Sequence, residues 1–422
     1  MKENKYKRII EEKAVKYMLS FGYMIDDSTY IKNVKRLLPA SIIRVRENQM
    51  QFDIYHIFDN TVETKDNDEE IINRIDKLFT NALSMALDKD REYNKKSLID
   101  ISGGLDCRVI NYVAKKLGYK DIVNVCFSQE NSNEYKVAKM LNKDLGFDMI
   151  FLPLDNANYL YKIDDIVSKN YGLSLYSTTT GVINLCNYLN FDYFGIEHGG
   201  LLGDMHDGCM PGEKYTKHEP ASFKHGMRFS RVLKNDIVDD DYLKTFKNNE
   251  LFTVFGRGLL AGYSTVIIRN TRFEFFSPYG DVDFYDYFLS IPIEKRVKEK
   301  ILQKWIDKKY PEAFKIPYDK TMCRININKK LLKIKKFTIK VKTKIKMFLH
   351  IVEKNNMNPI EYWYRSNTHV KNFINEYYEK NIELIDDGSD LKEMIRKVFE
   401  EGNVRDKTMA LTALSAIKLY LK

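Results

Sequence analysis

Residues 97–108 carry a pattern that could bind a phosphate group, Ser-Leu-Ile-Asp-Ile-Ser-Gly-Gly-Leu-Asp-Cys-Arg. Residues 98–101 have the length and branching of a buried strand, and an apolar helical pattern begins at Val109 and stops at Gly118. A strand, a glycine turn and a helix N-terminus in this order direct backbone N–H groups toward an anion. Asp106, in the first helical turn, could then hold Mg²⁺ against bound phosphates.

A second glycine-rich segment follows a predicted strand at 193–196 and reads Glu-His-Gly-Gly-Leu-Leu-Gly-Asp over residues 197–204. Parallel sheets bind ligands at the carboxyl ends of their strands, so we expect both segments at the same edge. Each segment supplies glycines and one carboxylate, Asp106 in the first and Asp204 in the second. Two such loops can bracket a magnesium pyrophosphate.

The string Ser-Gly-Gly-Leu-Asp at residues 102–106 resembles the pyrophosphate loop (PP-loop) of ATP pyrophosphatases, and with Arg108 it looks most like the asparagine synthetase family. It is not a Walker A loop, because no Gly-Lys-Ser/Thr follows. The resemblance extends over about residues 20–320. It implies ATP and Mg²⁺, and a reaction in which a substrate carboxylate is adenylated and then attacked by ammonia or an amine. The products would be an amide, AMP and pyrophosphate.

The resemblance also implies roles for individual residues. Asp106 and Asp204 would hold Mg²⁺, and Lys320 would reach the pyrophosphate, where a cation offsets the negative charge that grows during carboxylate attack. A surface position is the alternative for Lys320, and a plain turn residue is the alternative for Ser128. The residues expected to bind the nucleotide are Ser102, Gly103, Gly104, Leu105, Asp106, Cys107, Arg108, Ser128, Gly200 and Gly203.

Residues 274–281, Glu-Phe-Phe-Ser-Pro-Tyr-Gly-Asp, resemble the family segment Glu-x-Arg-x-Pro-Phe-Leu-Asp. The resemblance makes Glu274 and Asp281 catalytic candidates, although Asp281 would also serve as a helix N-cap. Phe276 stands where the family has its arginine, which is a departure from the pattern.

A second departure lies in the second loop, where Leu201 stands at the position of a glutamate in asparagine synthetases and a tyrosine in β-lactam synthetases. A leucine cannot transfer a proton, so the conversion of aspartate to asparagine is in doubt. Glu197 or His198 could supply the proton transfer from slightly earlier in the loop. We therefore expect another substrate, a small carboxylic acid or a sugar acid.

Strand and helix patterns alternate over residues 97–200 and predict an α/β fold with a doubly wound parallel sheet. The resemblance makes this sheet one of the PP-loop type (HUP-like, adenine nucleotide alpha hydrolase-like), with a C-terminal helical extension and a short N-terminal β-hairpin. Strands are predicted at 98–101, 122–127, 149–152 and 193–196, helices at 11–19, 66–90, 108–117, 133–145, 180–190, 284–290 and 295–305, and a hairpin from 41–46 and 50–55.

The predicted domain organisation has three parts: a helix and hairpin linker at 1–75, the PP-loop domain at 76–325, and a basic helical region at 326–422. Glutamine-hydrolysing members of the family begin with a nucleophile domain, and only about 20 residues precede the linker here. We therefore expect no glutaminase in this chain. Its nitrogen would come from ammonia, a separate glutaminase or an amine on the substrate.

The composition is that of a globular protein, with 422 residues of which 44% are hydrophobic and 13% aromatic. The five cysteines show no paired spacing, which argues against a zinc ribbon or a dithiol site. We find neither a signal-peptide pattern nor an apolar run long enough to span a bilayer, and we expect a cytoplasmic protein. One further group could suggest a metal site, although its spacing favours structural or substrate-contacting roles: His198, His206, His218, His225 and Cys209.

The net charge of +9 could suit nucleic acid, an anionic membrane or an anionic substrate, or it could reflect a lysine-rich background. Residues 328–348 are dense in lysine, with Ile, Leu, Phe and Val interleaved. This stretch could contact an anionic membrane or a lipid-linked carbohydrate, and a solvated helix packed on the domain is the alternative.

Other functions fit parts of the same pattern. A synthetase that tailors a lactam or a peptide would share the adenylation chemistry. A PP-loop enzyme that modifies RNA would suit the charge, but the absence of paired cysteines and the Leu-Asp form of the loop count against it, and we expect no nucleic acid partner. A degenerate nucleotide-binding partner protein would explain the departures at Leu201 and Phe276.

Overall fold

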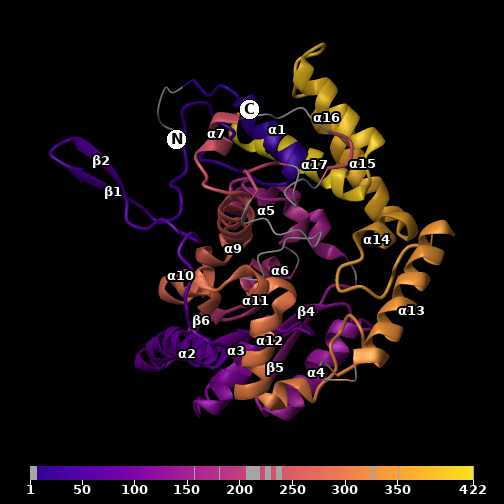
Figure 1. Cartoon of the computed structure of the whole chain (residues 1–422). Helices are drawn as coiled ribbons and strands as arrows, with labels where there is room; N and C mark the ends of the chain where they lie inside the picture. The colour runs from indigo at the N-terminus through magenta and orange to yellow at the C-terminus, as the bar shows by residue number, and fades with distance from the viewer. Residues whose placement is uncertain are drawn as a thin grey trace.

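A five-stranded parallel sheet in the order β5-β4-β3-β6-β7 forms the centre of the protein (Figure 1). The structure, a computed structural model, describes residues 7–155, 157–179, 181–205, 219–223, 230–233, 240–324, 327, 329–349 and 351–421. The predicted α/β class with a parallel sheet is confirmed. The first and last residues of the four predicted strands lie within two residues of the observed boundaries. The strands are β3 (Lys96–Asp100), β4 (Ile122–Ser128), β5 (Asp148–Pro153), β6 (Phe194–His198) and β7 (Phe275–Phe276).

Helices cover both faces of this sheet, as in a doubly wound fold. Successive side chains of a strand point to opposite faces, and here they pack into two different cores. In β4, Val125 belongs to one core and Cys126 to the other. On the Cys126 side, the ring of Phe79 makes edge-to-face contacts with Tyr279 and Trp305. The helices of this side are α2 (Asp68–Glu92), α3 (Asp106–Lys116), α4 (Asn133–Leu145), α10 (Val282–Ser290) and α12 (Lys300–Lys309).

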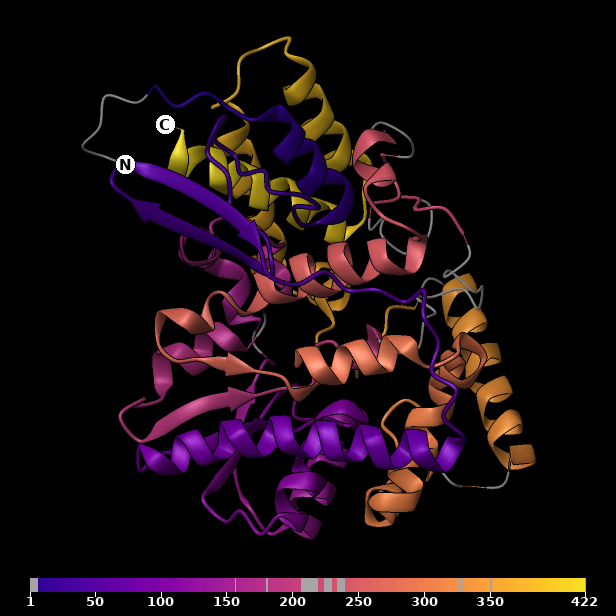
Figure 2. The ribbon, with the colours of Figure 1, turned by 60° about the vertical axis from the view of Figure 1, so that its left-hand side comes forward.

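The long helix α2 runs along this face of the sheet (Figure 2). It begins with a capping box, in which the side chain of Asn67 accepts from the N–H of Glu70 while the Glu70 carboxylate accepts from the N–H of Asn67. The acidic run 66–70 is therefore the start of a helix, as its sequence predicts.

The second core joins the two ends of the chain. Helix α17 (Val404–Tyr420) is buried on nearly all sides and contacts α1 (Glu12–Phe21), so the first and last helices lie together (Figure 1). This core also takes in residues 152–186, and the predicted domain boundaries at 75 and 325 cut across it. Its other helices are α5 (Ile163–Asn170), α6 (Val182–Tyr188), α14 (Ile360–Ser366), α15 (Thr368–Ile382) and α16 (Asp390–Glu401).

The single helix predicted at 295–305 is wrong, because the chain breaks it. Lys298 and Glu299 adopt φ of 59° and 57°, in the left-handed region, and they separate α11 (Ile293–Arg296) from α12. The amphipathic pattern of residues 295–305 runs through this break.

A continuous helical stretch, Asn249–Thr271, is long and apolar enough to cross a membrane by length and composition, with a mean hydropathy of 1.5 over its best window. The expectation that no run has that length is therefore corrected. The stretch comprises α8 (Asn249–Thr253), the π-helix η4 (Val254–Gly262), α9 (Tyr263–Val266) and η5 (Arg269–Thr271). More than half of that window is buried, and it forms charged pairs inside the protein: Glu250 with Arg296 at 2.6 Å and Arg269 with Glu197 at 2.6 Å.

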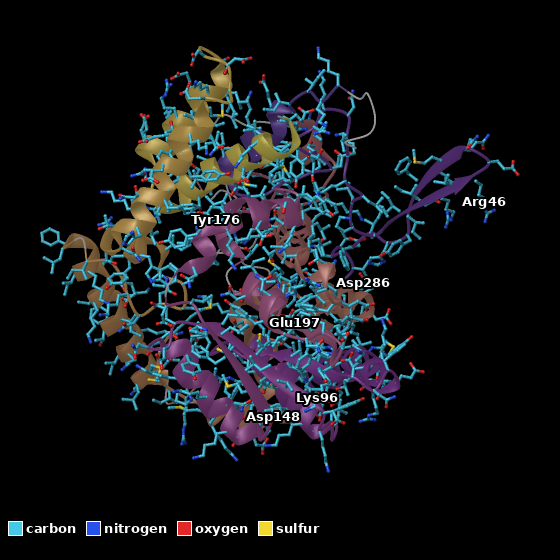
Figure 3. All side chains as sticks on the ribbon, turned by 180° about the vertical axis from the view of Figure 1, so that it is seen from behind. Arg46, Lys96, Asp148, Tyr176, Glu197 and Asp286 are labelled. Atoms are coloured by element: carbon cyan, nitrogen blue, oxygen red, sulfur yellow. The ribbon has the colours of Figure 1, made fainter. Side chains whose placement is uncertain are left out.

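The predicted hairpin forms from β1 (Ser41–Arg46) and β2 (Gln49–Ile54), with Glu47 and Asn48 in the turn. It projects away from the rest of the chain, and Arg46 lies near its tip (Figure 3). Side chains on both of its faces are exposed.

Replacing residues 43–52 with a short glycine linker should leave the free energy of unfolding within about 0.5 kcal/mol of the original value, because these side chains contribute to neither core. Urea denaturation measures this. The control is Phe79→Ala, which removes a buried ring and should cost about 3–5 kcal/mol. A comparable loss on removal of the hairpin would show that it stabilises the fold.

Candidate functional site

The strand order places a topological switch point between β3 and β6. From β3 the chain passes through α3 to β4 on one side, whereas β6 pairs with the other side of β3. Ile99 of β3 lies beside His198 of β6, so the two strands end together. The two glycine segments follow these two strand ends, at the position where open parallel sheets bind ligands.

The two loops pack directly on each other. A Cβ atom added to Gly200 would lie 2.7 Å from Cβ of Asp106 and 3.0 Å from the backbone N of Cys107. A Cβ atom on Gly203 would likewise lie 2.8 Å from Cβ of Asp106. These separations are too short for any side chain, so the close approach of the loops requires glycine at both positions. The structure thus brings together the predicted residues Asp106, Gly200 and Gly203.

The first loop is held by its own side chains. The hydroxyl of Ser102 accepts from the N–H of Gly104 at 3.2 Å, and Leu105 is buried at the start of α3. The thiol of Cys107 lies between Ser102 and Gly200, and burial raises its pKa well above the usual value. Cys107 is therefore a neutral packing residue between the two loops.

Arg108 joins the first loop to residues 313–317. Its side chain is 1% exposed, and its guanidinium donates to the carbonyl oxygens of Gly103 at 3.0 Å, Ala313 at 2.9 Å and Pro317 at 2.8 Å. A fourth bond runs to the carbonyl of Ile316 at 2.9 Å. Burial lowers the pKa of Arg108 to about 10, so the group remains charged at neutral pH. It holds the backbone beside the loop, and both of its terminal nitrogens donate to carbonyls.

Lys320 lies at the edge formed by these segments. Burial acts to lower its pKa, but the neighbouring Tyr318 and the carboxylates of Asp204 and Asp319 outweigh that effect and the pKa is raised. Asp204 also acts electrostatically on the guanidinium of Arg257. The predicted Asp204 and Lys320 therefore face the same region.

A carboxylate that the sequence did not single out lies against the glycine loop. Glu134, in the first turn of α4, faces the backbone N–H of Gly103 and the carboxyl of Asp319. Burial, and then the neighbouring charge of Asp319, raise the pKa of Glu134 to about 7. An acidic residue in the first turn of a helix that follows a parallel strand is a signal that could have identified it.

Ser128 supports this helix from below. It is fully buried at the end of β4, and its hydroxyl lies 2.6 Å from the hydroxyl of Ser132, the N-cap of α4. In the structure Ser128 therefore positions the helix that carries Glu134.

Glu197 and His198 are fully buried beneath the loops. Glu197 Oε2 accepts from Nε of Arg269 at 2.6 Å, and His198 Nε2 lies 3.1 Å from Oδ2 of Asp90. Burial, reinforced by the charge of Glu197 and opposed by Arg269, raises the pKa of Asp100 well above its usual value. These groups form a buried charged layer under the site, and neither Glu197 nor His198 reaches its surface.

The two candidate residues of segment 274–281 lie in different places. Glu274 is exposed and pairs with Lys89 at 2.8 Å, so the structure does not bring it to the loops. Asp281 accepts from the N–H of Phe284 at 3.1 Å and is the N-cap of α10. Next to it, a Cβ on Gly280 would lie 3.0 Å from the side chain of Leu202, so Asp281 flanks the second loop.

Leu201, which differs from the residue that the family pattern has at this position, packs against the π-helix η4. A Cβ on Gly262 of η4 would lie 3.1 Å from Cδ1 of Leu201. Its carbonyl accepts from the hydroxyl of Ser277 at 2.6 Å. The side chain at this position thus serves packing. Phe276 lies edge-on to the ring of His198, with centroids 6.1 Å apart.

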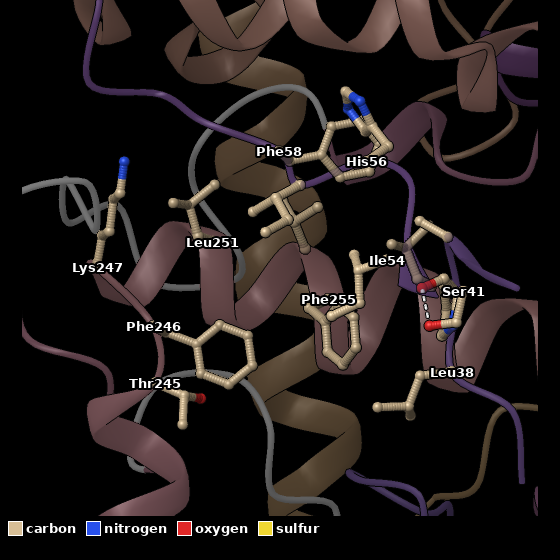
Figure 4. A pocket seen from close by; sticks show the side chains of 15 residues that line it. Leu38, Ser41, Ile54, His56, Phe58, Thr245, Phe246, Lys247, Leu251 and Phe255 are labelled. Atoms are coloured by element: carbon tan, nitrogen blue, oxygen red, sulfur yellow. Dashed lines mark hydrogen bonds between the residues drawn. The ribbon is translucent and has the colours of Figure 1, made fainter. Parts of the chain in front are cut away.

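A separate pocket of about 410 Å³ lies at the base of the hairpin (Figure 4). Its lining is mainly apolar and includes Leu38, Ile54 and Phe255, together with His56. None of the residues predicted for the site lines it.

Within the described residues, no three His, Cys, Asp or Glu side chains are grouped so that they could hold a metal ion. Asp106 and Asp204 are compatible with Mg²⁺ in another way, since this ion commonly takes one or two carboxylates together with substrate phosphates. His206, Cys209, His218 and His225 lie outside the described residues. No protein-family model matches the chain, and a search of curated proteins finds no relative.

Arg108→Lys should lower the free energy of unfolding by about 2–4 kcal/mol, because a single ammonium group cannot satisfy four buried carbonyls. Hydrogen exchange should quicken at residues 313–320. Denaturant unfolding and exchange mass spectrometry measure the two effects. The matched control is Arg91→Lys on the exposed side of α2, with an expected change below about 0.5 kcal/mol. Equal stability of the two variants would contradict the role of Arg108 in holding residues 313–317 against the first loop.

Glu134→Gln should remove part of the pH dependence of stability. The folded state raises the pKa of Glu134 to about 7, so it binds a proton that the unfolded chain releases above about pH 4.5. The free energy of unfolding therefore falls as the pH rises from about 4.5 to 7, and this fall should be shallower in the variant. Urea denaturation at several pH values measures it, with the exposed Glu130→Gln as control. Parallel curves for Glu134→Gln and the parent would contradict the assignment.

Proposed function

We propose that the chain is an ATP-dependent amide ligase with a PP-loop (HUP-like) domain of the asparagine synthetase type. The observation that supports it best is the contact of two glycine loops at the switch point of the sheet, with Asp106 in one loop and Asp204 in the other. In the proposed reaction a carboxylate oxygen of the substrate attacks the α-phosphorus of ATP and pyrophosphate leaves. The nitrogen of ammonia or an amine then attacks the acyl carbon and AMP leaves.

The phosphate position in this proposal is the first loop. The N–H of Gly103 faces the carboxyl of Glu134, so an acidic group already lies beside this turn. The Asp319 carboxyl lies on the same side, since a Cβ on Gly103 would be 2.8 Å from its Cγ. A bound triphosphate would therefore displace Glu134 and Asp319 from the loop. Mg²⁺, when bound, would neutralise phosphate charge between Asp106 and Asp204, and Lys320 would add a further cation.

The proton of the attacking nitrogen needs an acceptor. Leu201 cannot serve, and Glu197 and His198 are buried and paired with Arg269 and Asp90. Glu134 is the better candidate, because a carboxyl with a pKa of about 7 at the edge of the site is suited to proton transfer near neutral pH. The acceptor in this proposal therefore comes from α4 rather than from the second loop.

The substrate we propose is a small carboxylic acid or sugar acid other than aspartate. Its nitrogen would be free ammonia, ammonia from a separate glutaminase, or an amine on a second substrate. A requirement for ATP is compatible with a cytoplasmic location. A synthetase that tailors a metabolite or a peptide would use the same chemistry and is included in the proposal.

Exchange of labelled pyrophosphate into ATP tests the adenylation step. With Mg²⁺ and a panel of carboxylic acids including aspartate, we expect exchange with at least one acid other than aspartate. Asp106→Asn and Asp204→Asn should each reduce it by about 10²-fold or more, because charge stabilisation of this kind is worth that much. The control is Asp148→Asn, an exposed carboxylate at the amino end of β5, away from Glu197 (Figure 3).

Two results would count against the proposal. Exchange that survives in both Asp106→Asn and Asp204→Asn would separate the activity from these loops. Brisk formation of asparagine from aspartate would instead keep the reaction class and overturn the proposed substrate.

A second candidate function is nucleotide binding without turnover. The packing of Leu201 on η4, where the family has a proton-transferring residue, favours it. Calorimetry with a non-hydrolysable ATP analogue separates the two functions, because both require binding whereas only the ligase supports pyrophosphate exchange.

A further inference from the structure

Helix α13 (Lys329–Phe348) lies along the outer edge of the protein (Figures 1 and 2). It exposes large apolar side chains to solvent, among them Phe337 at 67% and Phe348 at 83%. Soluble surfaces rarely carry a contiguous apolar patch of this kind unless something binds to it.

The exposed apolar side chains form a single stripe. With about 100° of rotation per residue, they fall within a sector of about 120° on the helix. They are Leu331, Ile334, Phe337, Val341, Ile345 and Phe348. The helix is thus amphipathic, with its most apolar side turned to solvent.

The body of the protein contacts a different side of α13. Leu332 and Ile339 are half-buried and lie about 140–160° around the helix from the centre of the stripe. Leu332 lines a cavity of about 390 Å³ together with Leu105 and Tyr318. The helix is therefore anchored by one side, and no residue in the described part of the chain buries the stripe.

The charges of α13 are all of one sign. Its 20 residues include nine lysines and no aspartate or glutamate. Most of the lysines lie beside the stripe: Lys333, Lys340 and Lys344 flank one edge of it, and Lys335 and Lys342 flank the other. An apolar stripe between two rows of cations is the pattern of a helix that lies in the interface of an anionic bilayer.

We propose that α13 docks this protein on a membrane surface that contains anionic phospholipids. The side chains of Phe337 and Phe348 would enter the boundary between headgroups and acyl chains, and the lysines would remain at the level of the phosphates. A nucleic acid would use the lysines but would leave the aliphatic residues of the stripe in water. The stripe therefore favours the bilayer over RNA or DNA.

Flotation of the full-length protein with vesicles tests the proposal. Vesicles of phosphatidylcholine with one third phosphatidylglycerol should carry the protein upward, and pure phosphatidylcholine should bind at least about tenfold less. High salt should weaken the binding, because it screens the lysine charges. Absence of flotation with the anionic vesicles at low salt would overturn the proposal.

The variant Phe337→Asp/Ile345→Asp introduces charge into the stripe and should reduce vesicle binding by about tenfold or more. Both side chains are exposed, so its melting temperature should not change. The matched control is Phe52→Asp, a similarly exposed ring on the hairpin, which should float like the parent protein. Equal binding of the stripe variant and the control would overturn the role of α13.

The variant Lys333→Gln/Lys340→Gln/Lys344→Gln tests the contribution of the lysine charges. It should lose most of the preference for anionic over neutral vesicles. A preference unchanged from the parent would contradict the electrostatic part of the proposal. A labelled single-stranded RNA is tested in parallel. Salt-dependent RNA binding in the absence of vesicle flotation would overturn the proposal that α13 binds a membrane and would favour a nucleic acid partner.

Discussion

The guanidinium of Arg108 is the constraint on which the site depends. Four carbonyl oxygens converge on it, one from the glycine loop and three from residues 313–317. A buried cation with these bonds is costly to rearrange, since any movement of either segment strands a charge or a carbonyl away from water. The turn at Gly103 is thereby fixed to the segment that leads to Lys320. The glycine contacts with Asp106 then fix the second loop to the first.

Beneath the loops, the buried charges impose a second constraint. Asp100 and Glu197 both lie beside the guanidinium of Arg269, and burial together with the charge of Glu197 raises the pKa of Asp100 well above its usual value. A Cβ on Gly199 would lie 2.6 Å from Oδ2 of Asp100, so the second loop rests on that carboxyl. Glu197 and His198, which the sequence analysis gives as candidate bases, thus lie in the buried layer beneath the second loop. Glu134 instead lies beside the first loop and is half-buried, and its pKa is raised to about 7.

Local features of this protein were predictable from the sequence, and long-range contacts were not. The strands follow from short β-branched runs, and the loop positions of Gly103, Gly200 and Asp106 follow from a compact motif. The partners of Arg108 lie up to 209 residues away, and no periodicity encodes them. The burial of Glu197 depends in the same way on Arg269, 72 residues further on. The break at Lys298 was missed because apolar spacing continues across a left-handed turn.

The proposed nucleotide site and the proposed membrane helix belong to one continuous stretch of chain. Arg108 holds residues 313–317, the next residues carry Asp319 and Lys320, and α13 begins at Lys329. The cavity lined by Leu105 and Leu332 joins the first glycine loop to the first turns of that helix. In the proposed reaction Asp319 leaves Gly103 when a phosphate enters, so the residues that would admit the nucleotide lie between the Arg108 contacts and the proposed membrane helix.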